Sequence, residues 1–165
     1  MTWRGSTTAA DRVFSALPYL LPLTDAARVG GAFFRFIDQF PALRPISYAI
    51  QLLALPANIL ETSIPFGSLV IFFLLIFLVV RNTNISHFIR FNALQAILIG
   101  FIIVVCNLVI GLLAATPGFT LVVETLANVI FLGGIAAVAY AIVQSLRGQY
   151  AEIPTISEAV HMQVR

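Results

Sequence analysis

The sequence predicts an all-α, polytopic membrane protein: a four-helix transmembrane bundle with an interfacial segment after the first span and a short amphipathic C-terminal helix. Apolar residues make up 60% of the 165 residues and charged residues only 10%, and the mean hydropathy is +1.00. This composition excludes an ordinary soluble globular protein. A hydrocarbon core of about 30 Å needs about 20 residues of helix, so the long apolar runs mark the spans of a single membrane domain, 1–165.

The clearest predicted span is the third, 88–115. After Arg90 it carries no charged side chain. Lipid offers no hydrogen-bond partner to an unpaired backbone, so this run has to be helical. Ser86 is expected to cap its first turn, because the hydroxyl accepts a bond from an amide that the helix leaves free.

The fourth predicted span, 119–146, follows after a tight turn. Pro117 fixes φ at the first central residue of such a turn, and Gly118 readily adopts the positive φ of the second. The two spans should therefore form an antiparallel hairpin. Gly148 is expected to end the fourth helix in the left-handed conformation. Small residues at four-residue spacing on this helix would let another backbone come close: Gly133, Ala137 and Ala141.

The first predicted span, 13–34, contains an acid and a base one turn apart. Charges in a membrane are costly, so we expect Asp25 and Arg28 to face protein. A charged head before a short apolar run is also typical of a secretory signal, with Ala26 and Ala27 in the cleavage region, and this alternative stays open.

The segment 35–60 interleaves arginine and aromatic side chains, which favour the headgroup zone, so it is predicted to lie along the membrane. A crossing by 45–60 is the alternative. The second predicted span, 62–80, is an uncharged run that is rich in Phe, Leu and Ile.

The C-terminal tail, 148–165, is predicted to contain a short helix. Thr155 and Glu158 have the spacing of a capping box. Ile156, Val160 and Val164 would then lie on one side of the helix, and we expect that side to dock on membrane or protein.

The arginines predict the orientation. Four spans place both termini and the 81–90 loop on one side of the membrane. That side collects Arg4, Arg12, Arg81, Arg90 and Arg147, whereas the other holds Arg35 and Arg44, with Arg28 near its boundary. Because arginine excess marks the cytoplasmic face, both termini are expected to be cytoplasmic or stromal.

Motifs of enzymes and cofactor sites are missing from the sequence. There is no Gly-rich phosphate loop, HExxH, CxxC or GxSxG, and two histidines with one cysteine do not complete a metal site. The nine arginines are dispersed, which argues against a nucleic-acid partner. We therefore expect no enzyme activity and no cofactor.

The spans do contain uncharged polar residues and one further acid: Asn92, Gln95, Asn107, Glu124, Asn128 and Gln144. Such side chains either fasten helices together or line a polar path. If the hairpin is centred on its turn, Gly100, Asn107 and Gly111 face Glu124 and Asn128. A direct or water-bridged contact between Asn107 and Asn128 is therefore predicted.

Three runs of the sequence resemble the twenty-kilodalton subunit family of the Tic complex, the translocon at the inner envelope membrane of chloroplasts. They are SALPYLLPL (15–23), VVRNTNISHFIRFNALQA (79–96) and QSLRGQYAEIPTISEAVHMQVR (144–165). The resemblance implies a four-helix membrane protein with stromal termini that forms, or contributes to, a pore for precursor proteins. Its motif residues here are Arg81, Asn82, His87, Phe88, Arg90, Phe91, Asn92, Gln95, Tyr150, Ile153, Pro154 and Gln163.

No leader typical of plastid targeting precedes Arg12, which favours a cyanobacterial or plastid-encoded member. The membrane would then be a cyanobacterial one or the plastid inner envelope. The implied partners are lipid, other translocon subunits or further copies of the chain, and precursor polypeptides. Two functions remain open: a subunit of a protein-conducting pore, and a non-conducting structural or assembly subunit.

Overall fold

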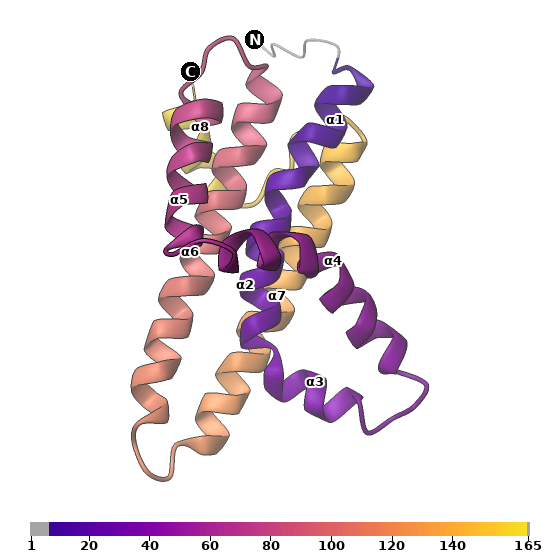
Figure 1. Ribbon diagram of the computed structural model, residues 1–165, viewed down its shortest axis with the longest axis vertical. Helices are drawn as coiled ribbons and strands as arrows, with labels where there is room; N and C mark the ends of the chain where they lie inside the picture. The colour runs from indigo at the N-terminus through magenta and orange to yellow at the C-terminus, as the bar shows by residue number, and fades with distance from the viewer. Residues whose placement is uncertain (1–6, 165) are drawn as a thin grey trace.

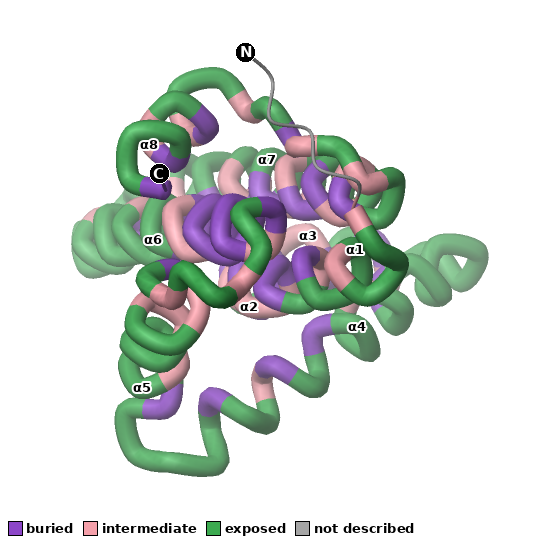
Figure 2. The backbone as a smooth tube through the Cα atoms, turned by 90° about the horizontal axis from the view of Figure 1, so that it is seen from above, coloured by how far each residue is buried: buried purple, intermediate pink, exposed green. Residues whose placement is uncertain are grey.

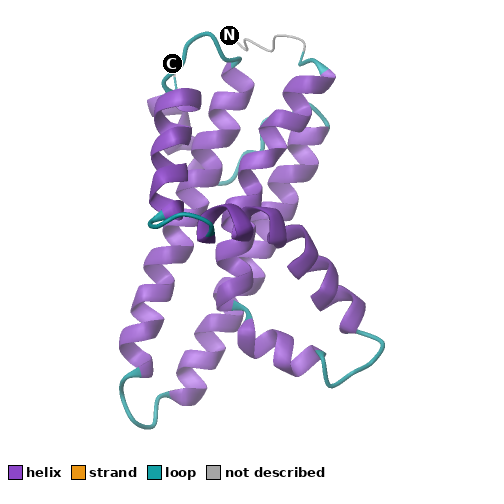
Figure 3. Cartoon of the chain, viewed as in Figure 1, coloured by secondary structure: helices purple, strands orange, loops and turns teal. Residues whose placement is uncertain are grey.

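The computed structural model describes residues 7–164, and every regular element in this range is helical (Figure 3). The predicted all-α class is confirmed. Arg4 and Arg165 lie outside the described residues. The elements are α1 (Ala9–Ala16), the 3-10 turn η1 (Leu17–Tyr19), α2 (Leu20–Val29), α3 (Gly31–Ile37), α4 (Arg44–Thr62), α5 (Gly67–Leu74), the π-helical η2 (Leu75–Val80), α6 (His87–Ala114), α7 (Thr120–Leu146) and α8 (Ile156–Gln163).

The hairpin of α6 and α7 forms the long axis of the molecule (Figure 1). Both helices are long and apolar enough to cross a membrane, and their bounds agree with the predicted spans 88–115 and 119–146. The predicted turn is also confirmed. Phe119 N donates to Thr116 O at 3.3 Å, and Gly118 has a φ of 88°.

The two predicted helix ends have the expected caps. Ser86 Oγ accepts from Ile89 N at the start of α6. At the end of α7, Gly148 has a φ of 74°, and Gln149 N donates to Gln144 O at 2.9 Å. This is the bonding pattern of a Schellman motif, in which the left-handed residue lets the chain turn back onto the last carbonyls.

Three short elements make up one irregular helix at the beginning of the chain. α1, η1 and α2 follow one another in right-handed dihedral angles from 9 to 29. Pro22 has no N–H to bond Pro18, so the helix tightens to a 3-10 turn there. The helix ends at Gly30, not at Phe34 as the predicted span implies. A Cβ at Gly30 would collide with the Phe131 ring.

The region from 35 to 80 differs from the prediction. α4 is a continuous helix of 19 residues, and it meets the pair of α5 and η2 at an angle of 97°. The predicted span 62–80 therefore begins too early, because a regular helix resumes only at Gly67. The bend depends on Phe66, which has a φ of 57°, and on Gly67, where a Cβ would collide with the Glu61 carbonyl.

The core lies where α1 and α2 pack against both α6 and α7 (Figure 2). Its largest members include Tyr19, Leu23, Ile99, Ile103 and Val138. α2 and α7 come close together at Gly134, where a Cβ would lie 3.1 Å from the Ala26 Cβ. The predicted small-residue stripe is therefore wrong in part. Ala141 is buried, but a Cβ at Gly133 would meet no atom of the described residues within 4 Å.

The predicted tail helix is present as α8. Val160 and Val164 are buried against Phe91 and Leu94 of α6, so the helix docks on protein. The capping box, however, is not formed. Thr155 makes no capping bond with its side chain, because its φ of 69° turns it away; Ser157 Oγ instead accepts from Ile153 N at 2.7 Å.

Candidate functional site

Asn92 and Gln95 lie in a fully buried hydrogen-bond network. The Tyr19 hydroxyl donates to Asn92 Oδ1 at 2.9 Å and lies 3.3 Å from Gln95 Oε1. Ser145 Oγ also donates to Asn92 Oδ1, at 2.8 Å. Gln95 Nε2 donates to Ala151 O at 2.8 Å. The network therefore joins η1, α6, α7 and the segment after α7.

His87 holds the tail from the start of α6. Its Nε2 lies 3.1 Å from Val164 O and its Nδ1 lies 3.0 Å from the Tyr150 hydroxyl. A carbonyl only accepts, so Nε2 carries the proton and Nδ1 accepts from Tyr150. The Tyr150 ring packs edge-on against Phe88 and Phe91.

Three further motif residues lie in or next to the loop before α6. Arg90 Nε donates to Val80 O at 2.8 Å, at the carbonyl end of η2. The Arg81 guanidinium lies 5.9 Å from the centre of the Phe77 ring, within the range of a cation–π contact. Asn82 Oδ1 accepts from Asn84 N at 3.0 Å. The positions of these groups indicate local structural roles.

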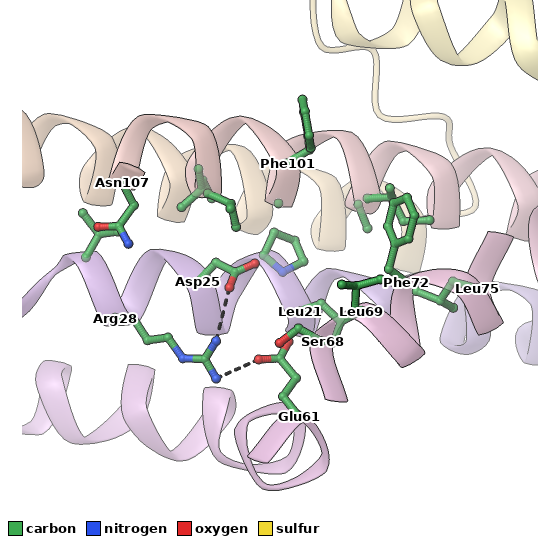
Figure 4. Close-up of a pocket in the computed structure, with 17 residues that line it drawn as sticks. Leu21, Asp25, Arg28, Glu61, Ser68, Leu69, Phe72, Leu75, Phe101 and Asn107 are labelled. Atoms are coloured by element: carbon green, nitrogen blue, oxygen red, sulfur yellow. Dashed lines mark hydrogen bonds and ion pairs between the residues drawn. The ribbon is translucent and has the colours of Figure 1, made fainter. Parts of the chain in front are cut away.

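A second polar site lies in a cavity of about 430 Å³ between α2, α5 and α6, closed at one end by the last turn of α4 (Figure 4). Arg28 pairs with Asp25 at 3.4 Å and with Glu61 at 2.7 Å. It also donates to Asn58 Oδ1 at 2.8 Å. The expectation that Asp25 and Arg28 face protein is thereby confirmed. Glu61 is a further ion-pair partner of Arg28 that the sequence analysis did not predict.

The cavity lies at the middle of α6. Gly100 is the fourteenth of its 28 residues, about 20 Å from either end at 1.5 Å per residue. A Cβ at Gly100 would lie 3.3 Å from Asp25 Oδ2, so the carboxylate packs directly on this helix. α6 is long and apolar enough to cross a membrane, and the charged groups lie beside its midpoint.

One side of the cavity is open between α5 and α6. Its rim consists of apolar side chains that are all well exposed: Leu69, Phe72, Phe101 and Val104. In a membrane such a rim faces lipid or another polypeptide. The cavity is therefore accessible from the side of the helix bundle.

The predicted bond between Asn107 and Asn128 is not formed. Asn107 lines the cavity (Figure 4), and Asn128 Oδ1 is buried without a hydrogen-bond partner among the described residues. The helices meet instead through Ile103, whose Cδ1 would lie 3.1 Å from a Cβ at Gly134. This contact rotates Gly100 toward α2, whereas a Cβ at Gly111 would have no neighbour within 4 Å in the described part of the chain.

The remaining candidates lie apart from both polar sites. Glu124 pairs with Arg35 of α3 at 3.5 Å, and both side chains are largely exposed. Gln144 Oε1 is buried without a hydrogen-bond partner in the part of the chain that the structure describes. Glu124 and Gln144 therefore contribute neither to the network nor to the cavity.

Sequence reasoning missed Glu61, although a signal was present. Glu61 is the one charged residue between 45 and 80, and an ionisable side chain in such an apolar region indicates a functional site. Its partner Arg28 lies 33 positions away, so the pairing itself depends on the tertiary fold. Within residues 7–164, no group of three or more His, Cys, Asp or Glu side chains could hold a metal ion.

Comparison with known proteins identifies the family. The family model described as "Chloroplast import apparatus Tic20-like" matches residues 9–160. The chain is 48% identical over 156 residues to a Tic20 family protein of Synechocystis sp., covering 94% of this chain and 93% of that protein.

Plastid relatives are similar over nearly the same length. The chain is 34% identical over 160 residues to the protein TIC 20-v, chloroplastic, of Arabidopsis thaliana, covering 96% of this chain and 73% of that protein. It is 32% identical over 160 residues to the Tic20 family protein Ycf60 of Gracilaria tenuistipitata var. liui, covering 95% and 76%. The protein is therefore a member of the Tic20 family of the chloroplast import apparatus, as its sequence motifs predict.

Proposed function

We propose that the chain is a membrane subunit of a protein translocon and contributes to a protein-conducting path for precursor proteins. The observation that carries the proposal is the charged cavity at the middle of α6, beside a helix that is broken at the same depth. Ionisable groups inside a membrane are rare and usually mark a substrate pathway. Broken helices at the bilayer midplane commonly form the binding sites of transporters.

The proposal gives the chain four crossings: 9–29, the bent pair from 44 to 80, α6 and α7. Its support is the depth of Glu61 in the last turn of α4. Glu61 pairs with Arg28, and Arg28 with Asp25, which packs on the midpoint of α6. α4 thus reaches the middle of the membrane instead of lying along its surface, and α5 with η2 completes the crossing.

An even number of crossings places α1 and α8 on one side, in accord with their common end of the molecule (Figure 1). The arginine excess of that side makes it the cytoplasmic or stromal side. The membrane is a cyanobacterial membrane or the plastid inner envelope. Four crossings are too few to enclose a polypeptide, so the path also needs other translocon subunits or further copies of the chain.

A photo-crosslinking residue at Asn107 tests the proposal, with the same residue at Leu121 as control. Asn107 lines the cavity, whereas Leu121 is highly exposed on α7 outside it. A precursor arrested in transit in native membranes should crosslink to position 107 and not to 121. Equal crosslinking at both positions, or none at 107, would argue against the cavity as part of the path.

A non-conducting assembly subunit is the second candidate. It is favoured by the network of Tyr19, Asn92 and Ser145, in which the side-chain amide oxygen is fully paired inside the bundle. Such groups fasten helices. In this case partner proteins, but no precursor, would crosslink to position 107.

A further inference from the structure

We propose that the cavity between α2, α5 and α6 binds a basic side chain, lysine or arginine, that is carried by an apolar segment of a precursor polypeptide in transit. The proposal rests on the proposed function and names the class of segment that this site takes. It depends on the charge balance of the cavity, on the acceptors at its floor and on its apolar rim.

The charged side chains of the cavity do not balance. Asp25 and Glu61 supply two carboxylates, and Arg28 supplies one guanidinium. No other charged side chain is among the described residues that line the cavity. When both carboxylates are ionised, one negative charge is left over, and a cation that enters the cavity pairs with it.

The floor of the cavity offers oxygen acceptors in addition to charge. The Glu61 side chain is only 4% exposed, and its Oε2 contacts Arg28 without accepting a well-directed hydrogen bond. Asp25 pairs with Arg28 through Oδ1, while Oδ2 lies against Gly100, where the missing side chain leaves room. An ammonium or guanidinium group has several N–H donors and suits these oxygens.

The rim defines the surroundings of the basic residue. Leu69, Phe72, Phe101 and Val104 border the opening and carry no polar group. Side chains that flank the basic residue contact this rim, and the free-energy cost of desolvating them is smallest when they are apolar as well. The site therefore favours a basic residue within an apolar stretch over a uniformly polar segment.

The charge balance favours a transient occupant over a resident one. Arg28 already competes for both carboxylates, so only one net charge attracts the incoming cation, and binding stays exchangeable. A second copy of the chain is a poor fit, since the only basic residues of α2, α5, η2, α6 and α7 besides Arg28 are His87 and Arg90, in the first turn of α6 and far from its middle. A precursor that passes through the membrane meets these conditions.

The test uses the full-length chain with a photo-crosslinking residue at Phe101 on the rim. Two precursors of equal length are arrested in native membranes; both carry the same apolar stretch, with lysine at its centre in one and glutamine in the other. We expect about fivefold more crosslinking with lysine, the ratio for roughly 1 kcal/mol. Asp25→Asn and Glu61→Gln should each abolish the difference.

These variants separate binding from folding, because each leaves one carboxylate for one guanidinium. Glu124→Gln is the matched control, since it removes an acid outside the cavity and should keep the preference. Asp25→Glu keeps the charge and should keep the preference as well. Equal crosslinking of both precursors would overturn the proposal while the proposed function stands, whereas crosslinks to resident proteins alone, or none, would overturn both.

Discussion

The Tyr19 hydroxyl donates a 2.9 Å hydrogen bond to the side-chain oxygen of Asn92, and both residues are fully buried where η1 crosses α6. They are 73 positions apart in the chain. Ser145 donates to the same oxygen from α7, so one amide joins three helices. The site is a polar connection between η1, α6 and α7.

We expect Tyr19→Phe to lower the free energy of unfolding by about 1 kcal/mol, because it removes one buried bond and leaves Asn92 paired with Ser145. Asn92→Leu should lower the free energy of unfolding by roughly 2 to 3 kcal/mol, because the buried hydroxyls of Tyr19 and Ser145 both lose their acceptor. Thermal unfolding in detergent measures both. Asn107→Leu is the control, since Asn107 makes no bond to Asn128; a loss as large as that of Asn92→Leu would contradict the network's role.

The tail helix supplies a second prediction. Val160 is fully buried between α8 and α6, so Val160→Asp places an unpaired charge in an apolar contact and should release the helix. Faster amide exchange throughout Ile156–Gln163 would report this. Met162→Asp is the matched control, because Met162 on the same helix is 72% exposed. Rapid exchange of α8 in the unmodified protein would contradict the docked position.

The bend between α4 and α5 depends on a glycine. In Gly67→Ala the new Cβ collides with the Glu61 carbonyl, a backbone group that cannot move aside. We expect this variant to lower the free energy of unfolding by about 1 to 3 kcal/mol. Gly133→Ala should be neutral or stabilise by up to about 1 kcal/mol, because a Cβ there meets no atom within 4 Å among residues 7–164. Unfolding temperatures of the two variants make the comparison; equal shifts would show that the bend does not need Gly67.

The proposed orientation predicts the labelling of single cysteines in a Cys106→Ala background. Asn84 belongs to the loop between η2 and α6, Ala159 to α8, and Gly118 to the turn between α6 and α7. The loop and α8 lie at one end of the molecule, and the turn lies at the opposite end (Figure 1). An impermeant thiol reagent added outside should label a cysteine at 118 but not at 84 or 159. The reverse pattern would invert the orientation, and unequal labelling at 84 and 159 would contradict an even number of crossings between them.

The elements that could be predicted are those with local causes. The bounds of α6 and α7 follow from uninterrupted apolar runs, and the turn between them from Pro117 and Gly118. Ser86 caps the start of α6 through its side chain, and Gly148 ends α7 through its left-handed backbone conformation. In each case the determining groups lie within one turn of the feature.

The remaining features depend on contacts between distant segments. Asn107 and Asn128 are at the same height along the hairpin. The rotation of each helix about its own axis, however, depends on the packing contact of Gly134 with Ile103 and on that of Gly100 with Asp25. The bend after α4 needs Gly67 to touch Glu61, and the role of Glu61 needs Arg28. No periodicity within one helix contains this information.

If the cavity at the middle of α6 receives a polypeptide in transit, a side chain that lines the cavity is shielded while the polypeptide is there. The rate at which a thiol reagent modifies Ser68→Cys, in the Cys106→Ala background, tests it most directly, because Ser68 lines the cavity. We expect an arrested precursor to slow this modification and to leave the modification of a cysteine at Gly118 unaffected. An unchanged rate at position 68 with the precursor in place would contradict passage of the polypeptide through the cavity.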